Sequence, residues 1–256
     1  MTGFVSLVGA GPGDPELLTR RACDRLRDAD LILVDALVPD TMIAVMDELA
    51  PRAQRFYVGK RAGRHSIDQD GIHALLIRGA KRGQRVVRLK AGDPFVLGRG
   101  GEEALALEAA GIAYEVVPGV SSAFAAPALA GIPVTHRGVA TAVAVISGHA
   151  ASAYEPVLDG LAPGTLTLVV LMGVRTRGAI ATRLVERGWP ATTPAAIIHG
   201  ASQPDAIVWR GALSSLADAT FDTELPAVLV IGDVVALSSQ IRAGSVALPA
   251  VSEKTS

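Results

Sequence analysis

Ten short apolar segments, separated by stretches with helical spacing, recur along the whole chain and restrict the fold more than any other feature. The segments span residues 5–8, 31–34, 55–58, 85–89, 113–117, 142–146, 166–172, 195–198, 206–209 and 227–231. Because they lack strict alternation of polar and apolar residues, we expect strands buried on both faces, in mostly parallel sheets covered by helices. The chain is therefore predicted to be an α/β protein.

A proline-rich segment near the middle suggests where this pattern divides. Residues 118–134, PGVSSAFAAPALAGIPV, contain three prolines, and we interpret them as a junction with one short helix. We expect an N-terminal α/β domain over residues 1–117 and a C-terminal α/β domain over 118–243. Residues 244–256 are small and polar without a period, and are predicted to be a disordered tail.

Composition excludes several classes of function. The 24 basic and 25 acidic residues give a formal net charge of -1, unlike a dedicated nucleic-acid binder. The single cysteine, Cys23, permits no intrachain disulfide, and the five histidines show no metal-binding spacing. No apolar stretch approaches the ~20 residues of a membrane span, and the N-terminus lacks a signal-peptide pattern. We expect a cytoplasmic protein with no metal and neither membrane nor nucleic acid as a partner.

A glycine loop after the first apolar segment raises the possibility of a nicotinamide-dependent oxidoreductase. GAGPGD, residues 9–14, follows a predicted strand and precedes a predicted helix, as a dinucleotide loop would. The third glycine of that fingerprint is replaced by Asp14, whose carboxylate would compete with a pyrophosphate for the helix amides. Pro12 removes a further backbone donor, so the dinucleotide hypothesis is the weaker one.

A second loop, AGDPFVLGRGGEE, follows the strand predicted over residues 85–89. Its small residues allow a ligand to approach the backbone, and Asp93 offers a carboxylate to a hydroxyl or amine. Glu102 and Glu103 suit the first turn of a helix, where the helix dipole favours negative charge.

Three arginines that precede this loop, Arg82, Arg85 and Arg88, are expected to be ordinary surface charges. A helix is predicted to begin near Ser66, with Gln69 completing a capping box.

Five motifs carry a resemblance to a known family. In chain order they are VSLVGAGPGDPELLT, VGKRAGRHS, VVRLKAGDPFVLGRGGEE, VVPGVSS and GIPVTHR. Together they resemble the uroporphyrinogen-III C-methyltransferases, within the class III tetrapyrrole methyltransferases that use S-adenosylmethionine. The resemblance covers residues 3–242, and VGKRAG, GDPF and GRGGEE are its most specific parts.

The resemblance implies two α/β domains with a ligand cleft between them, usually in a homodimer. It implies S-adenosylmethionine as co-substrate, with S-adenosylhomocysteine as its product. Uroporphyrinogen III would be methylated to precorrin-1 and then to precorrin-2, on the way to sirohaem, cobalamin or haem d1. A later precorrin methyltransferase is the alternative within the class, and a non-enzymatic binding module is another; VGKRAG and GRGGEE argue against the former.

The resemblance also assigns cofactor contacts along the chain. They are Pro12, Ala91, Gly92, Asp93, Val96, Ser121, Ser122, Met172 and Ala201. The family usually has glycine where this chain has Ala91 and Ala201, and an added methyl group matters most where the backbone is left-handed.

Catalytic and substrate contacts are implied in the same way. Methylating a pyrrole carbon requires loss of a proton, so a base is needed. Asp35 matches the family's proposed proton acceptor and Lys60 its donor, while Glu102 is a rival base. The carboxylate-rich substrate requires local positive charge, for which we expect Arg61, Arg99 and Arg137. Ala36 replaces an arginine common in the family, which removes one further candidate.

Overall fold

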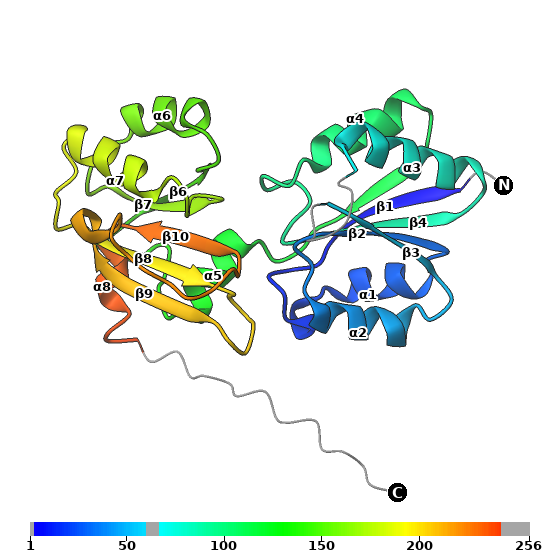
Figure 1. The fold of residues 1–256 in the computed structure, drawn as a ribbon, viewed down its shortest axis with the longest axis horizontal. Helices are drawn as coiled ribbons and strands as arrows, with labels where there is room; N and C mark the ends of the chain where they lie inside the picture. Colours follow the sequence, from blue (N-terminus) through cyan, green and yellow to red (C-terminus); the bar gives the residue numbers. More distant parts are fainter. Residues whose placement is uncertain (1–2, 60–66, 242–256) are drawn as a thin grey trace, which may run out of the picture.

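The N-terminal half forms a five-stranded parallel sheet (Figure 1). The computed structural model describes residues 3–59 and 67–241. Strands β1 (Phe4–Gly9), β2 (Leu31–Asp35), β3 (Gln54–Val58), β4 (Arg85–Lys90) and β5 (Tyr114–Val117) lie in the order β3-β2-β4-β1-β5. All four pairings are parallel, as the unbroken apolar runs predicted.

Helices cover both faces of this sheet (Figure 1). On one face, α1 (Arg20–Arg27) and α2 (Asp40–Leu49) bury Leu26, Met42 and Met46 against the strands. On the other, α3 (Gln69–Lys81) and α4 (Gly100–Ala109) bury Leu76 and Leu107. The two apolar clusters explain why β1 and β2 are buried on both faces and show no strict alternation of polar and apolar residues.

Helix α3 begins later than the capping-box pattern predicted. Its N-cap is Asp68, whose carboxylate accepts a hydrogen bond from the backbone N–H of Gly71 at 2.8 Å. An aspartate at this place satisfies one of the free amides of the first turn, so Gln69 is the first helical residue. Ser66 itself lies outside the described residues.

The C-terminal half has a second five-stranded sheet, and here the expectation of mostly parallel strands is wrong. Strands β6 (Ala142–Ser147), β7 (Leu166–Leu171), β8 (Pro194–His199), β9 (Ile207–Ala212) and β10 (Ala227–Ile231) lie in the order β6-β7-β10-β8-β9. Only β6 and β7 pair in parallel; the other three pairings are antiparallel. Unbroken apolar runs report burial on both faces, not direction, and the short β8–β9 connection leaves no room for a crossover helix.

Helices again cover both faces of this sheet. Helices α6 (Ala151–Gly160) and α7 (Arg177–Glu186) bury Leu158 and Leu184 on one side. Helices α5 (Ser122–Leu129) and α8 (Val234–Leu237) bury Ala126 and Val234 on the other. The expected α/β class with two sheets is thus confirmed. We retain the division after residue 117 as a proposal, since β5 ends at Val117 and α5 packs on the second sheet.

The carboxyl ends of β1, β2, β4 and β5 lead into loops that face the second lobe, the place where open α/β sheets bind ligands. One hydrogen bond joins the lobes there directly, from the backbone N–H of Asp14 to Ser202 Oγ at 2.9 Å. Among the described residues, no helix has the length and apolar character needed to cross a bilayer.

Candidate active site

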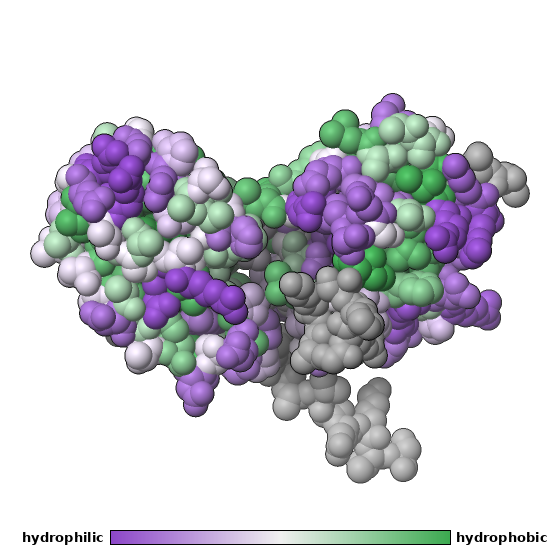
Figure 2. Space-filling model, turned by 45° about the horizontal axis from the view of Figure 1, so that its top comes forward, coloured by the Kyte–Doolittle hydropathy of each residue, from purple (hydrophilic) through white to green (hydrophobic). Residues whose placement is uncertain are grey.

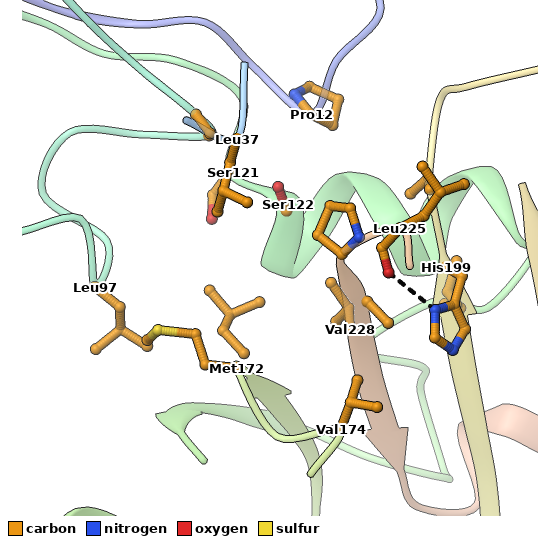
Figure 3. Close-up of a pocket in the computed structure, with 18 of the residues that line it drawn as sticks. Pro12, Leu37, Leu97, Ser121, Ser122, Met172, Val174, His199, Leu225 and Val228 are labelled. Atoms are coloured by element: carbon orange, nitrogen blue, oxygen red, sulfur yellow. Dashed lines mark hydrogen bonds between the residues drawn. The ribbon is translucent and has the colours of Figure 1, made fainter. Parts of the chain in front are cut away.

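A cavity of about 590 Å³ lies between the two lobes and is lined by residues of both. The space-filling view shows the molecule hollowed at this junction (Figure 2). Pro12 and the loop of Ser121 and Ser122 form one wall, and Met172, Val174 and Val228 form the other (Figure 3). This volume is in the range of small-molecule and cofactor sites.

Three glycines bring the loops after β1, β4 and β5 together beneath the cavity. A Cβ on Gly119 would lie 2.4 Å from the carbonyl oxygen of Gly92, and one on Gly9 would lie 2.6 Å from the same atom. Paired backbone hydrogen bonds of 3.2 and 2.8 Å between Gly11 and Gly92 tie the first two loops. Only glycine permits so close an approach of three backbones.

Asp93 holds the same loops from its side chain. Its Oδ1 accepts the backbone N–H of Phe95 at 2.8 Å, and its Oδ2 accepts that of Gly119 at 3.1 Å. The sequence suggested that this carboxylate binds a ligand. In the structure both oxygens already accept backbone hydrogen bonds, which makes Asp93 a brace between the β4 and β5 loops.

Left-handed backbone is concentrated at this cavity. Among the described residues, the non-glycine positions with positive φ are Leu97 (53°), Arg99 (60°), Met172 (59°) and Ser202 (72°). Three of them line the cavity and Ser202 lies between two lining residues. Such strain is costly and tends to persist at ligand-binding sites. Ala91 and Ala201 are not left-handed, so the alanines that replace family glycines add no backbone strain.

The structure brings most of the predicted site residues together. All nine residues assigned to the cofactor line the cavity: Pro12, Ala91, Gly92, Asp93, Val96, Ser121, Ser122, Met172 and Ala201. Asp35 and Arg99 line it too. Glu102 and Arg137 do not, and Arg137 lies in an exposed turn bridged by His136 and Ala140. Lys60 and Arg61 lie outside the described residues.

The two candidate bases differ in their surroundings. Glu102 forms a bidentate pair with Arg99 at 2.9 and 2.7 Å. These hydrogen bonds hold the pKa of the Glu102 carboxyl below its usual value, which weakens it as a base. The Asp35 side chain is 28% exposed and lines the cavity; its Oδ1 accepts the N–H of Leu37 at 3.3 Å, and its Oδ2 accepts a longer contact from Arg88 Nη2 at 3.4 Å. Geometry therefore favours Asp35.

The expectation that Arg88 is a surface charge is wrong. Arg88 is 3% exposed and lies among Lys90 and Glu103, which are 2% and 0% exposed. Residues 88 and 90 are two apart in β4, so both side chains project from one face of the sheet, toward α4. Burial and the charge of Arg88 lower the pKa of the Lys90 ammonium, and Glu103 opposes this shift.

Comparison with known proteins shows the family to which the chain belongs. The family model of tetrapyrrole (corrin/porphyrin) methylases matches residues 5–217. The chain belongs to this family.

Relatives within the methylase family are similar over nearly the whole chain. The siroheme synthases of Actinobacillus pleuropneumoniae serotype 7 and Serratia proteamaculans are each 46% identical, over 93% of this chain. The chain spans about half the length of these relatives, 49% and 50%.

Solved structures of two tetrapyrrole methyltransferases have a similar fold. The uroporphyrin-III C-methyl transferase of Thermus thermophilus, complexed with S-adenyl homocysteine, is 42% identical, with a TM-score of 0.78 over 92% of this chain and all of that one. A cobalt precorrin-4 methyltransferase is 27% identical, also with a TM-score of 0.78, over 91% of this chain and 95% of that one.

Several residues that line the cavity could not be found from the sequence. They are Leu37, Leu97, Val174, Arg175, His199, Gln203 and residues 223–228. No motif marks the last group, which reaches the cavity because β10 inserts between β7 and β8. His199 Nδ1 lies 3.1 Å from the carbonyl oxygen of Leu225, which ties the end of β8 to the segment before β10 on the second-lobe side of the cavity (Figure 3).

The first glycine loop does not suit a dinucleotide. Asp14 Oδ1 accepts the N–H of Glu16 at 2.9 Å and caps the short 3-10 helix Pro15–Leu17. The carboxylate therefore occupies the amide that a pyrophosphate would need. In the part of the chain that the structure describes, no cluster of His, Cys, Asp and Glu could hold a metal ion.

Proposed function

We propose that this chain transfers methyl groups from S-adenosylmethionine to ring carbons of uroporphyrinogen III. Two successive transfers would give precorrin-1 and then precorrin-2. The observation that carries the proposal is that all nine residues matching the family's cofactor contacts line one cavity between the lobes. The similar Thermus thermophilus enzyme, solved with S-adenyl homocysteine, supports both the substrate and the co-substrate.

The cavity suits a folded nucleoside with a charged tail. Pro12, Val96 and Val228 offer apolar surface for a base, and the hydroxyls of Ser121 and Ser122 offer polar contacts. Gly92 has a φ of 67° and would place a side chain 3.6 Å from the backbone N of Ser122. A side chain there would occupy space between the two loops that hold the ligand.

S-adenosylmethionine supplies an activated methyl group without a metal, because its leaving thioether is neutral. The protein's tasks are then to orient the acceptor carbon and to remove its proton. Asp35 accepts that proton in our proposal, since it carries a carboxylate that lines the cavity and is 28% exposed. Lys60, outside the described residues, is retained as the proposed proton donor.

Positive side chains would bind the carboxylates of the tetrapyrrole. Arg99, Arg137 and Arg61 are the proposed contacts from the sequence. The structure adds Arg175, which is exposed, lines the cavity and has no hydrogen bond or ion pair among the described residues. Its guanidinium is free to bind a carboxylate, whereas that of Arg99 is held by Glu102.

The remaining parts of the proposal rest on the relatives. Their name, siroheme synthase, favours sirohaem as the end product, with cobalamin and haem d1 as the other pathways that use precorrin-2. We further propose a homodimer located in the cytoplasm, as the family resemblance implies.

Anaerobic incubation of the purified protein with S-adenosylmethionine and freshly generated uroporphyrinogen III tests the proposal. We expect a mass gain of two methyl groups, followed over time through a singly methylated intermediate. If S-adenosylhomocysteine binds but no methyl group is transferred, the substrate is wrong, and later precorrins become the substrates to test.

Restoring the family glycines should have little effect. Ala91→Gly and Ala201→Gly remove methyl groups from positions without left-handed backbone, so affinity for S-adenosylhomocysteine should change by less than about fivefold. Gly92→Ala is the contrast, because alanine must adopt a φ of 67° there. That strain of ~1–2 kcal/mol predicts about 5- to 30-fold weaker binding by calorimetry. Equal effects of all three changes would contradict this account.

Arg175→Ala should impair binding of the tetrapyrrole selectively. Loss of one charge-assisted hydrogen bond, worth ~1–2 kcal/mol at an exposed site, predicts about a 5- to 30-fold higher KM for uroporphyrinogen III. The affinity for S-adenosylhomocysteine should be unchanged. Weaker S-adenosylhomocysteine binding would instead assign Arg175 to the carboxylate of the co-substrate, and no change in either constant would exclude it from the site.

A further inference from the structure

A buried cluster of charged side chains lies beside the cavity and takes no part in the proposed chemistry so far. Arg88 and Lys90 come from β4 and Glu103 from α4, and each is at most 3% exposed. Charged side chains are seldom buried unless they are paired, and burial removes their hydration. The cluster is therefore an expensive arrangement, placed where β2 and β4 end at the cavity.

Glu103 is the centre of this cluster. Its Oε1 accepts hydrogen bonds from Arg88 Nε and from Lys90 Nζ, both at 3.0 Å. Gln69 Nε2 approaches the same oxygen at 3.4 Å. One carboxylate thus holds two cations at fixed positions. Neither cation nor Glu103 is among the residues that line the cavity.

Arg88 extends from this anchor toward the cavity. Its Nη1 lies 3.4 Å from the carbonyl oxygen of Leu33 and 3.3 Å from that of Leu89, which fixes the plane of the guanidinium. Its Nη2 then donates to Asp35 Oδ2 at 3.4 Å. A guanidinium can make these contacts at once because its donors form a rigid planar fork; a lysine ammonium cannot.

Asp35 is the one member of the network that reaches the cavity. Its Oδ1 accepts from the N–H of Leu37 and its Oδ2 from Arg88, so both oxygens are oriented by donors. Asp35, Arg88 and Lys90 project from the same face of the sheet, because β2 and β4 are neighbours in register. The chain Glu103, Arg88, Asp35 therefore runs from the buried face of α4 to the cavity.

We infer that Arg88 is a positioning residue for Asp35, and that Glu103 keeps Arg88 in place for this purpose. The inference rests on the proposed function, in which the Asp35 carboxylate accepts the proton of the methylated ring carbon. Proton transfer requires the base within hydrogen-bond reach of that proton. Displacement of a reacting group by about 1 Å can cost about 100-fold in rate. Arg88 acts through Asp35 and does not itself line the cavity.

The chain offers a matched pair of variants. Arg88→Met removes the contact with Asp35 and leaves Glu103 paired with Lys90. Lys90→Met removes a cation of similar burial from the same carboxylate and leaves the Arg88 contact with Asp35 intact. We expect Arg88→Met to lower the single-turnover rate of methyl transfer about 100-fold and Lys90→Met to lower it less than about threefold. S-adenosylhomocysteine affinity should be similar in both variants.

A double variant separates positioning from a general loss of structure. Once Asp35 is replaced by Asn, Arg88 has no carboxylate base to orient, so Arg88→Met should not slow Asp35→Asn further. The inference would be overturned if Arg88→Met slowed methyl transfer by the same factor in the wild type and in Asp35→Asn. It would also be overturned if Arg88→Met and Lys90→Met transferred methyl groups at equal rates. Arg88→Lys, which keeps the charge without the fork, provides the same comparison should the methionine variant fail to fold.

Crystal structures of the two methionine variants give a readout that does not depend on activity. The Asp35 carboxylate should leave its position in Arg88→Met and keep it in Lys90→Met. An unmoved Asp35 in Arg88→Met would reject the inference even if the protein methylates nothing. Absence of methyl transfer by the wild type, with Asp35 displaced as expected, would instead reject only the proposed function.

Discussion

Asp35→Asn should abolish most methyl transfer while leaving the co-substrate site intact. The asparagine keeps the size of the side chain but has no carboxylate to accept a proton. A positioned general base contributes about 10²–10⁴-fold to rate, so the single-turnover rate should fall by that factor. Asp35 lies at the end of β2 and is not one of the nine proposed cofactor contacts, and asparagine fills the same volume, so S-adenosylhomocysteine should bind as to the wild type.

Glu102→Gln is the control for this prediction, because it tests the other candidate base. Glu102 does not line the cavity, and its pairing with Arg99 is exposed on both sides, at 51% and 57% of the side chains. Such pairs contribute ~0–1 kcal/mol, so we expect Glu102→Gln to lower the single-turnover rate by less than about fivefold. A large loss in Glu102→Gln together with near-normal turnover by Asp35→Asn would assign the proton to Glu102.

Much of the fold was predictable because burial leaves a local signature. Each apolar run corresponds to a strand, and the short helix expected within residues 118–134 is α5. Strand direction in the second sheet has no such signature. Strand β10 lies between β7 and β8, and this position depends on the path of the chain before it. The apolar residues 227–231 do not indicate which strands will be their neighbours.

The candidate site, like the fold, was predictable only in part. Two loops that line the cavity were named from the sequence: that of Gly92 because its small residues let a ligand approach the backbone, and that of Ser121 because of the family resemblance. Arg88 could not, because a charged residue in a strand is usually exposed, and its burial depends on Glu103 in α4. Arg175 lacks any motif, and its position depends on how the two lobes meet.

Gly119→Ala should separate the three loops that support the cavity and so weaken binding of S-adenosylhomocysteine. The added Cβ would lie 2.4 Å from the carbonyl oxygen of Gly92 and 2.8 Å from the Cα of Gly9, both rigid backbone atoms. Overpacking of this kind costs ~1–3 kcal/mol, equivalent to about 5- to 150-fold in affinity if the strain is relieved by moving the site. Calorimetric titration with S-adenosylhomocysteine measures it.

Two further variants test whether the effect of Gly119→Ala comes from the close contact between these loops. Gly9→Ala presses on the same carbonyl of Gly92 from the opposite loop, at 2.6 Å, and should weaken binding similarly. Gly160→Ala, at the end of α6, has no atom within 4 Å of its added Cβ and should bind as the wild type does. Because the close contacts at residues 9 and 119 share one partner, they predict one phenotype. Normal binding by both variants would show that the loops can part without disturbing the site, and would remove the structural basis for placing the co-substrate above them.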